Sequence, residues 1–102
     1  MESISRVTSG DLRLRRPSTA VLPVGSFEQH GDFLPLATDT FIATAIATRL
    51  ADTYGLLLLP AVPISCSHKH AAWPGTVSIS HQTFSAIVTD VAASPALEAS
   101  PG

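Results

Sequence analysis

Three side chains capable of metal binding or acid–base chemistry lie in one short, mostly apolar stretch. Residues 26–40 read SFEQHGDFLPLATDT and contain Glu28, His30 and Asp39. In an extended segment, residues two positions apart point the same way, so Glu28 and His30 can face one cavity. Carboxylate oxygens and imidazole nitrogens suit Zn²⁺, Mn²⁺ or a related divalent ion. The stretch therefore predicts metal ligands, and a pair of such ions can activate a shared water as a nucleophile.

Each of these residues also has an ordinary structural interpretation. Asp39 lies where a helix is expected to begin, and its carboxylate could cap that helix. His30 taken alone is typical of a hydrogen-bonded loop histidine, and Glu28 taken alone is typical of a solvated charge. The spacing by itself leaves these interpretations open beside metal binding.

A second loop carries further candidates. Residues 65–76 read SCSHKHAAWPGT and place His68 and His70 two positions apart. These imidazoles are candidate ligands, general acid–base groups or substrate contacts. Trp73 is either a lid over a site or a core aromatic. Cys66 is either a nucleophile or a small buried thiol.

The elements that must position both loops are predicted from the apolar patterns. Residues 20–25 and the unbroken apolar run 56–62 indicate two buried strands, and the alternation over 76–80 indicates a third. Helices are expected over about 40–54 and 81–93. This order predicts an α/β fold of three α/β/α layers with a mostly parallel sheet. Loops that follow the carboxyl ends of its strands should meet in one crevice.

Both expected helices carry an apolar face. The first stripe consists of Phe41, Ile42, Ala45, Ile46, Arg49 and Leu50, and the second face consists of Phe84, Ile87, Val88 and Val91. Gly55 is a suitable C-terminal stop for the first helix. These faces are expected to pack in the interior.

The chain divides into three parts. Residues 1–19 are interpreted as a polar, extended or loosely ordered lead-in, and residues 20–93 as the domain. Residues 94–102 contain two prolines and no periodicity, which is typical of a disordered tail. A sheet of three strands would leave edges unpaired, so we expect the first part of a larger, truncated domain.

Composition restricts the classes of function. The 102 residues suffice for one small domain, and 45% hydrophobic residues with mean hydropathy +0.30 predict a packed core. The net charge of −2 argues against a nucleic-acid partner, and we interpret the cluster Arg13, Arg15 and Arg16 as solvated. The sequence shows no membrane-spanning run, no convincing targeting signal and a single cysteine, so we expect a cytoplasmic protein.

Two of these stretches together resemble a known family. LPVGSFEQHGDFLPLATDT, followed by SHKHAAWPGTVSIS, is similar to the LPxGSxEQHGxHLPLxTD and Hxx[FW]PGT motifs of the creatininase (creatinine amidohydrolase) family. The resemblance covers about residues 20–93. It implies a three-layer α/β/α domain with two divalent metal ions, usually zinc or manganese, and frequent assembly into homo-oligomers.

The resemblance also implies roles for particular residues. Glu28 would ligate one ion, His30 the other, and Asp39 would bridge them. Ser67 falls where creatininase contacts its substrate, and His70 and Trp73 are the further candidates for substrate binding. No catalytic acid or base is assigned.

The chain departs from the family pattern in two ways. Phe33 stands where many members have a second histidine, at a position that is not one of the expected ligands. A later NGHGGN-like stretch, which supplies a further histidine ligand, is not found. Three ligands shared by two ions leave each ion under-coordinated.

These observations support several hypotheses. The chain is expected to be part of a metal-dependent amidohydrolase that cleaves a non-peptide C–N bond, in a cyclic amide or a formamide, of a small molecule. The alternatives are an inert fragment of such an enzyme, or the peptide-cleaving mycofactocin-maturation branch of the family. A third hypothesis is a non-enzymatic module that pairs through its open sheet edges.

Overall fold

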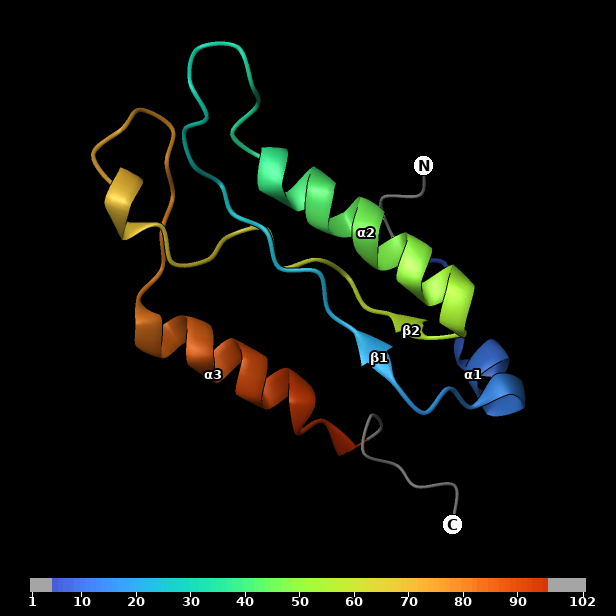
Figure 1. The fold of residues 1–102 in the computed structure, drawn as a ribbon. Helices are drawn as coiled ribbons and strands as arrows, with labels where there is room; N and C mark the ends of the chain where they lie inside the picture. The colour runs from blue at the N-terminus through green and yellow to red at the C-terminus, as the bar shows by residue number, and fades with distance from the viewer. Residues whose placement is uncertain (1–4, 96–102) are drawn as a thin grey trace.

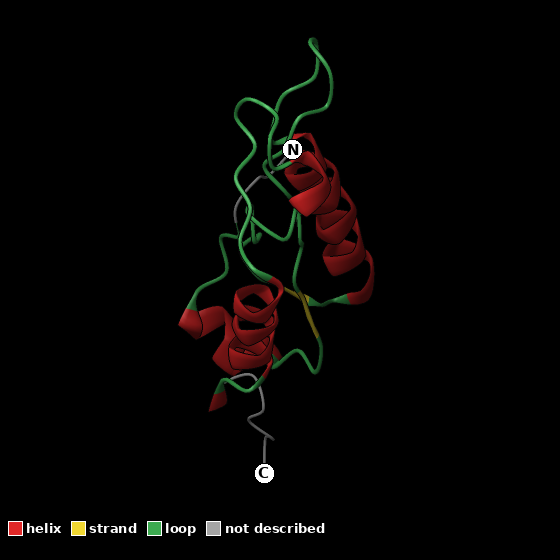
Figure 2. Cartoon of the chain, turned by 90° about the vertical axis from the view of Figure 1, so that its left-hand side faces the viewer, coloured by secondary structure: helices red, strands yellow, loops and turns green. Residues whose placement is uncertain are grey.

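The computed structural model describes residues 5–95. The helices are α1 (Ser9–Arg15), α2 (Thr38–Tyr54) and α3 (His81–Ala92), the strands are β1 (Ala20–Val21) and β2 (Leu57–Leu58), and a short 3-10 turn spans His68–His70. Figure 1 shows α2 and α3 on opposite sides of the strands, and the turned view in Figure 2 agrees. The predicted α/β class with helices on both sides of a parallel sheet is therefore confirmed. Most of the predicted tail, residues 96–102, lies outside the described residues.

The two strands are shorter than predicted. They pair in parallel with Ala20 opposite Leu57, and an isolated parallel bridge joins Val24 to Val62 further along. The pairing register shifts by one residue between these two points. Pro60 lies within the shift and has no N–H to donate to a ladder, which explains the interruption.

The third predicted strand, over residues 76–80, is wrong. Only Val77 pairs there, in an isolated antiparallel bridge with Phe27. The hydroxyls on either side are used in other contacts, because Thr76 accepts from the Gln29 N–H and Ser78 accepts from the Ser67 N–H. Alternating β-branched and hydroxyl residues here join two loops instead of extending a sheet.

The expectation that residues 1–19 lack regular structure is also wrong. A capping box starts α1: the Thr8 hydroxyl accepts from the Asp11 N–H at 3.1 Å, and the Asp11 carboxylate accepts from the Thr8 N–H at 3.0 Å. This pair satisfies backbone donors that the first turn would otherwise leave unpaired. The arginines of the predicted solvated cluster are exposed.

Helix α2 begins and ends close to the predicted bounds. Gly55 caps it with φ 68°, a left-handed conformation, and donates its N–H to the Ala51 carbonyl. The N-cap residue is Ala37, which has no side-chain hydrogen bond to the helix. The interpretation of Asp39 as a helix cap is therefore wrong, since its carboxylate binds elsewhere.

The predicted apolar stripe of α2 does not face the strands. The side chains buried on α2 are the small ones, Thr44, Ala47 and Ala51. Ile42 and Ile46 remain 54% and 57% exposed. Small residues let the helix lie close to the sheet, and the large residues of the same helix point outward.

Helix α3 packs loosely. The Ser80 hydroxyl caps it by accepting from the Thr83 N–H, and the predicted face of Phe84, Ile87, Val88 and Val91 is half-buried while the rest of the helix is largely exposed. No α3 residue is fully buried. Among residues 5–95, the large side chains form no fully buried core. The packed core expected from composition is therefore absent from the described residues. None of the helices in this part of the chain is long and apolar enough to cross a bilayer.

Candidate metal centre

The two candidate loops meet beyond the carboxyl ends of the strands, as predicted. The Ser65 hydroxyl donates to the Gly25 carbonyl at 2.7 Å, and the Val77 N–H donates to the Phe27 carbonyl at 2.8 Å. The Gln29 N–H donates to the Thr76 hydroxyl at 3.1 Å. These bonds join residues about forty to fifty positions apart and fix the first loop against the second.

Asp39 lies in the first turn of α2 and points back toward the first loop. Its Oδ2 accepts from the Ser26 hydroxyl at 2.8 Å, and its Oδ1 lies 3.2 Å from Nε2 of His30. These contacts hold the pKa of Asp39 below its ordinary value, chiefly through the Ser26 hydrogen bond and then through His30. The carboxylate is therefore kept ionised, as a metal ligand must be.

A glycine makes this approach possible. A Cβ on Gly25 would collide with the side chain and backbone of Thr40. Thr40 also donates its hydroxyl to the Ser26 carbonyl at 3.3 Å. Gly25 therefore lets the loop pass against the start of α2, which brings Ser26 to Asp39.

His30 is oriented by the backbone of its own loop. Its Nδ1 lies 2.9 Å from the Glu28 carbonyl oxygen, which can only accept, so Nδ1 carries the proton. In the neutral ring, Nε2 then directs a lone pair at Asp39. The pKa of His30 is raised, chiefly by the Glu28 carbonyl and further by Asp39. A histidine whose Nδ1–H is tied to a carbonyl while Nε2 faces a carboxylate has the arrangement typical of metal-binding imidazoles.

Glu28 completes the predicted set and connects it with the second loop. Its Oε2 lies 3.4 Å from Nε2 of His70. The structure thus brings Glu28, His30 and Asp39 together with His70. They form two acid–imidazole pairs, His30 with Asp39 and His70 with Glu28.

The two loops that meet here, residues 26–40 and 65–76, are together called the rim. Its carboxylates and imidazoles suit a divalent cation, but they are arranged in pairs. Within residues 5–95, no three His, Cys, Asp or Glu side chains converge on one point in a way that could hold an ion. A closed zinc site has four ligands and a catalytic one has three protein ligands. The described residues therefore provide part of a metal site.

The residues predicted to contact substrate are placed differently from one another. Ser67 and His70 line a pocket of about 440 Å³ beside Glu28, together with Cys66, His68, Lys69 and His81. The Ser67 hydroxyl is buried and has no hydrogen-bond partner among the described residues. Trp73 does not line this pocket and is 55% exposed, so the interpretation of Trp73 as a core aromatic is wrong.

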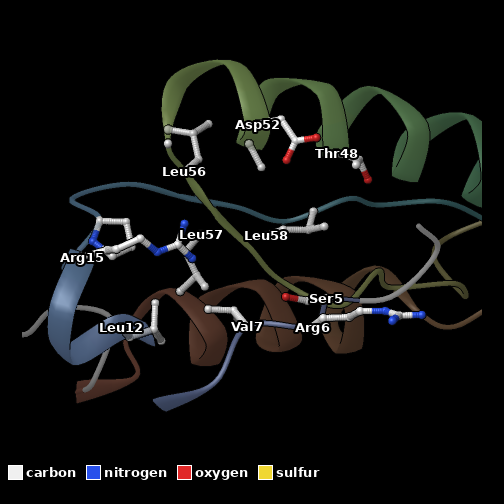
Figure 3. Close-up of a pocket in the computed structure, with 13 residues that line it drawn as sticks. Ser5, Arg6, Val7, Leu12, Arg15, Thr48, Asp52, Leu56, Leu57 and Leu58 are labelled. Atoms are coloured by element: carbon white, nitrogen blue, oxygen red, sulfur yellow. The ribbon is translucent and has the colours of Figure 1, made fainter. Parts of the chain in front are cut away.

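A larger pocket lies at the opposite end of the strands. Figure 3 shows it between the segment before α1, the end of α2 and the start of β2. Its volume is about 560 Å³, and Arg15, Asp52 and Leu57 are among its lining residues. None of the predicted site residues lines this pocket.

Comparisons with known proteins agree with this geometry. The family profile for creatininase, creatinine amidohydrolase, matches residues 5–98. The chain belongs to the creatininase family. It is 44% identical over 78 residues to the mycofactocin precursor peptide peptidase of Mycolicibacterium smegmatis, covering 71% of this chain and 31% of that protein. It is 30% identical over 92 residues to the creatinine amidohydrolase of Pseudomonas putida, covering 85% and 33%.

Solved creatininase structures share the fold. A manganese form aligns with a TM-score of 0.75 at 28% identity, over 84% of this chain and 37% of that one. A zinc–zinc form of a mutant aligns with a TM-score of 0.76 at 28% identity, over 84% and 36%. The chain thus spans about a third of the length of the curated relatives it matches. These two solved relatives are thus forms with divalent metals, zinc in one and manganese in the other.

Sequence reasoning missed three residues of the rim. Ser26 holds Asp39, Gln29 connects to His70, and Thr76 accepts from the Gln29 backbone. Ser26 and Gln29 lie inside the motif that pointed to the site. Their partners are 13 to 47 positions away, so spacing alone gave no signal for these contacts.

Proposed function

We propose that this chain supplies metal ligands to a creatininase-type amidohydrolase. Glu28, His30 and Asp39 would hold divalent ions, zinc or manganese, with Asp39 placed to bridge two of them. The observation that carries the proposal is the pairing of His30 Nε2 with Asp39 Oδ1 at 3.2 Å. With the His30 Nδ1 proton already donated to a carbonyl, two electron-rich atoms face each other. A proton or a metal cation between them relieves that repulsion.

The remaining contacts of the rim support the same role. When bound, the metal would polarise an amide carbonyl and activate a water for attack on it. Ser26 keeps Asp39 oriented through its hydroxyl. His70 holds Glu28 from the other loop. These contacts therefore orient the Asp39 and Glu28 carboxylates in the way that metal ligands require.

The substrate would lie in the pocket beside Glu28. Ser67 supports this placement, because a buried hydroxyl without a partner is costly unless a ligand or a further group satisfies it. We propose Ser67 and His70 as substrate-side residues, with Trp73 at the outer edge of its loop. The substrate would be an amide, either a small cyclic amide or formamide or the peptide bond that the mycobacterial relative's name indicates.

A catalytically inert chain is the second candidate. It is favoured by one observation, namely that residues 5–95 hold their candidate ligands as pairs rather than as a cluster of three. Metal binding tests whether these ligands can hold an ion, and hydrolysis by the metal-loaded chain then separates an active enzyme from an inert chain.

Assembly and location are also part of the proposal. The outward face of α2, with Ile42 and Ile46 exposed, supports contact with another subunit, so we propose a homo-oligomer. We also propose a cytoplasmic location, which the free Cys66 supports. The formal net charge of −2 argues against a nucleic-acid partner.

Calorimetric titration with Zn²⁺ and Mn²⁺ tests the proposal. We expect binding by the unaltered chain and a loss of at least about 100-fold in affinity for His30→Ala and Asp39→Ala, since losing a ligand costs more than losing a supporting residue. Asp32→Ala is the matched control, because Asp32 is an exposed carboxylate of the first loop and is not one of the predicted ligands. Equal affinities for all these proteins would contradict the proposal. Metal binding without hydrolysis of creatinine, a formamide or a short peptide would favour the inert chain.

A further inference from the structure

Gln29 lies between two candidate ligands, and its side chain reaches across to the second loop. Its Oε1 accepts from the Gly31 N–H at 3.0 Å, and its Nε2 lies 2.8 Å from Nδ1 of His70. A backbone N–H can only donate, so the atom facing Gly31 has to be the amide oxygen. The atom facing His70 is then the amide nitrogen, and the orientation of the side chain is settled by its partners.

This orientation determines where the proton of His70 lies. An amide nitrogen donates and does not accept, so Nδ1 of His70 must carry the lone pair. A neutral imidazole with a bare Nδ1 has its proton on Nε2. That nitrogen is the one 3.4 Å from Oε2 of Glu28, so the proton of His70 faces the carboxylate.

We propose that Gln29 is a positioning residue that fixes His70 as its Nε2–H tautomer and thereby directs a hydrogen-bond donor at Glu28. The path has two links, from the Gln29 amide to Nδ1 of His70 and from Nε2–H of His70 to Oε2 of Glu28. It connects neighbouring residues of one loop through a residue of the other. Only the description of Glu28 as a metal ligand rests on the proposed function.

The two histidines of the rim consequently have opposite tautomers and different tasks. His30 is protonated at Nδ1, by its bond to the Glu28 carbonyl, and presents a lone pair at Nε2. His70 presents a proton at Nε2 and so serves as a donor rather than as a ligand. Its proton faces one oxygen of the Glu28 carboxylate.

The side chain at position 29 has to meet two requirements at once. It must accept from Gly31 and donate to His70, and an amide of this length does both. A glutamate has the same shape but only accepts. Gln29→Glu would therefore force a proton onto Nδ1 of His70 while leaving the Gly31 bond in place.

Nitrogen-15 NMR of the metal-free chain, with labelled histidine and at about pH 8.5 where imidazole is neutral, measures this directly. We expect a pyridine-like Nδ1 and a pyrrole-like Nε2 for His70, and the reverse pattern for His30. In Gln29→Glu, Nδ1 of His70 should become pyrrole-like. Gln82→Glu is the matched control, because Gln82 is exposed on α3 and the charge change is the same.

A protonated Nδ1 on His70 in the unaltered chain would overturn the proposal, and so would an unchanged tautomer in a folded Gln29→Glu. The spectrum of the unaltered chain decides the question even where the variant does not fold. Because the measurement uses no metal, it is independent of the proposed function. Failure to bind zinc together with the expected tautomers would remove the metal centre and leave the role of Gln29 standing.

Discussion

The loop rim and the helices of this chain differ in how completely their groups are satisfied. In the rim, each of Glu28, His30 and Asp39 has a polar partner from its own loop, the facing loop or α2. On α2 the large apolar side chains face outward, and the buried positions are alanine and threonine. A few hydrogen bonds between loops can therefore define the geometry of a site locally. Burying large apolar side chains needs an opposing surface, which the described residues do not provide.

The largest effect should come from the point where the rim meets α2. Gly25→Ala would drive a methyl group into Thr40, including its backbone, and neither can move without shifting the helix. We expect a loss of about 3 kcal/mol or more in the free energy of unfolding, together with loss of the Ser26–Asp39 bond. Urea unfolding followed by circular dichroism measures the loss.

Gly10→Ala is the matched control for that substitution. A Cβ on Gly10 would come no closer than 3.6 Å to its neighbours, and the residue lies within α1. Alanine there should stabilise the chain by about 0.5–1 kcal/mol. If Gly25→Ala were tolerated as well as Gly10→Ala, the close passage of the loop over α2 would be refuted.

Two neighbouring residues on α2 test which face of this helix is buried. Ala47 is 3% exposed and faces the strands, so Ala47→Leu should overpack this contact and cost about 1–3 kcal/mol. Ile46 points outward, so Ile46→Ala should cost less than about 1 kcal/mol, where burial of this residue would make the cost about 2–5 kcal/mol. Thermal unfolding at low protein concentration compares them. A larger loss for Ile46→Ala would mean that α2 is turned the other way.

The sequence alone predicts the two long helices and part of the candidate site. Periodicity predicted α2 and α3 within two residues or so, and Gly55 marked the end of α2, because these signals act through neighbouring residues. The apolar periodicity identifies the stripe on α2 but not the side to which it points, because a periodic pattern does not show what packs against a helix face. The spacing of Glu28 and His30 predicted that they share a cavity. The link from Gln29 to His70 spans 41 positions and required the fold.

The first helix shows a different limit. The capping pair Thr8 and Asp11 was visible in the sequence, but the polar composition around it favoured an irregular segment. Tertiary burial contributes little to α1, whose seven residues include none that are buried. Thr8→Ala should therefore cost about 1 kcal/mol and melt α1 locally, seen as faster amide exchange over the helix. Ser9→Ala, one position inside the helix, should leave the exchange unchanged, and equal effects of both would argue against the cap.

The smallest expected effect is a dependence of stability on pH, which comes from His30 and Asp39 of the rim. The pKa of His30 is raised, so its contribution to stability is present below the ordinary value of about 6.5 and is lost as pH rises through the folded pKa. The pKa of Asp39 is lowered, so its contribution is present above about 3.9 and is lost as pH falls through the folded value. The metal-free chain should consequently be slightly more stable near pH 5.5 than near pH 8.5.

Zinc should respond to pH in the opposite direction, because a ligand imidazole must lose its second proton before it binds. Urea unfolding without metal and zinc titration, each at about pH 5.5 and 8.5, would show apo stability falling while zinc affinity rises. His30→Gln should flatten the first dependence and abolish the second. Parallel changes in both quantities would mean that His30 does not exchange a proton for a metal ion at the Asp39 carboxylate, and that the rim is a salt bridge alone.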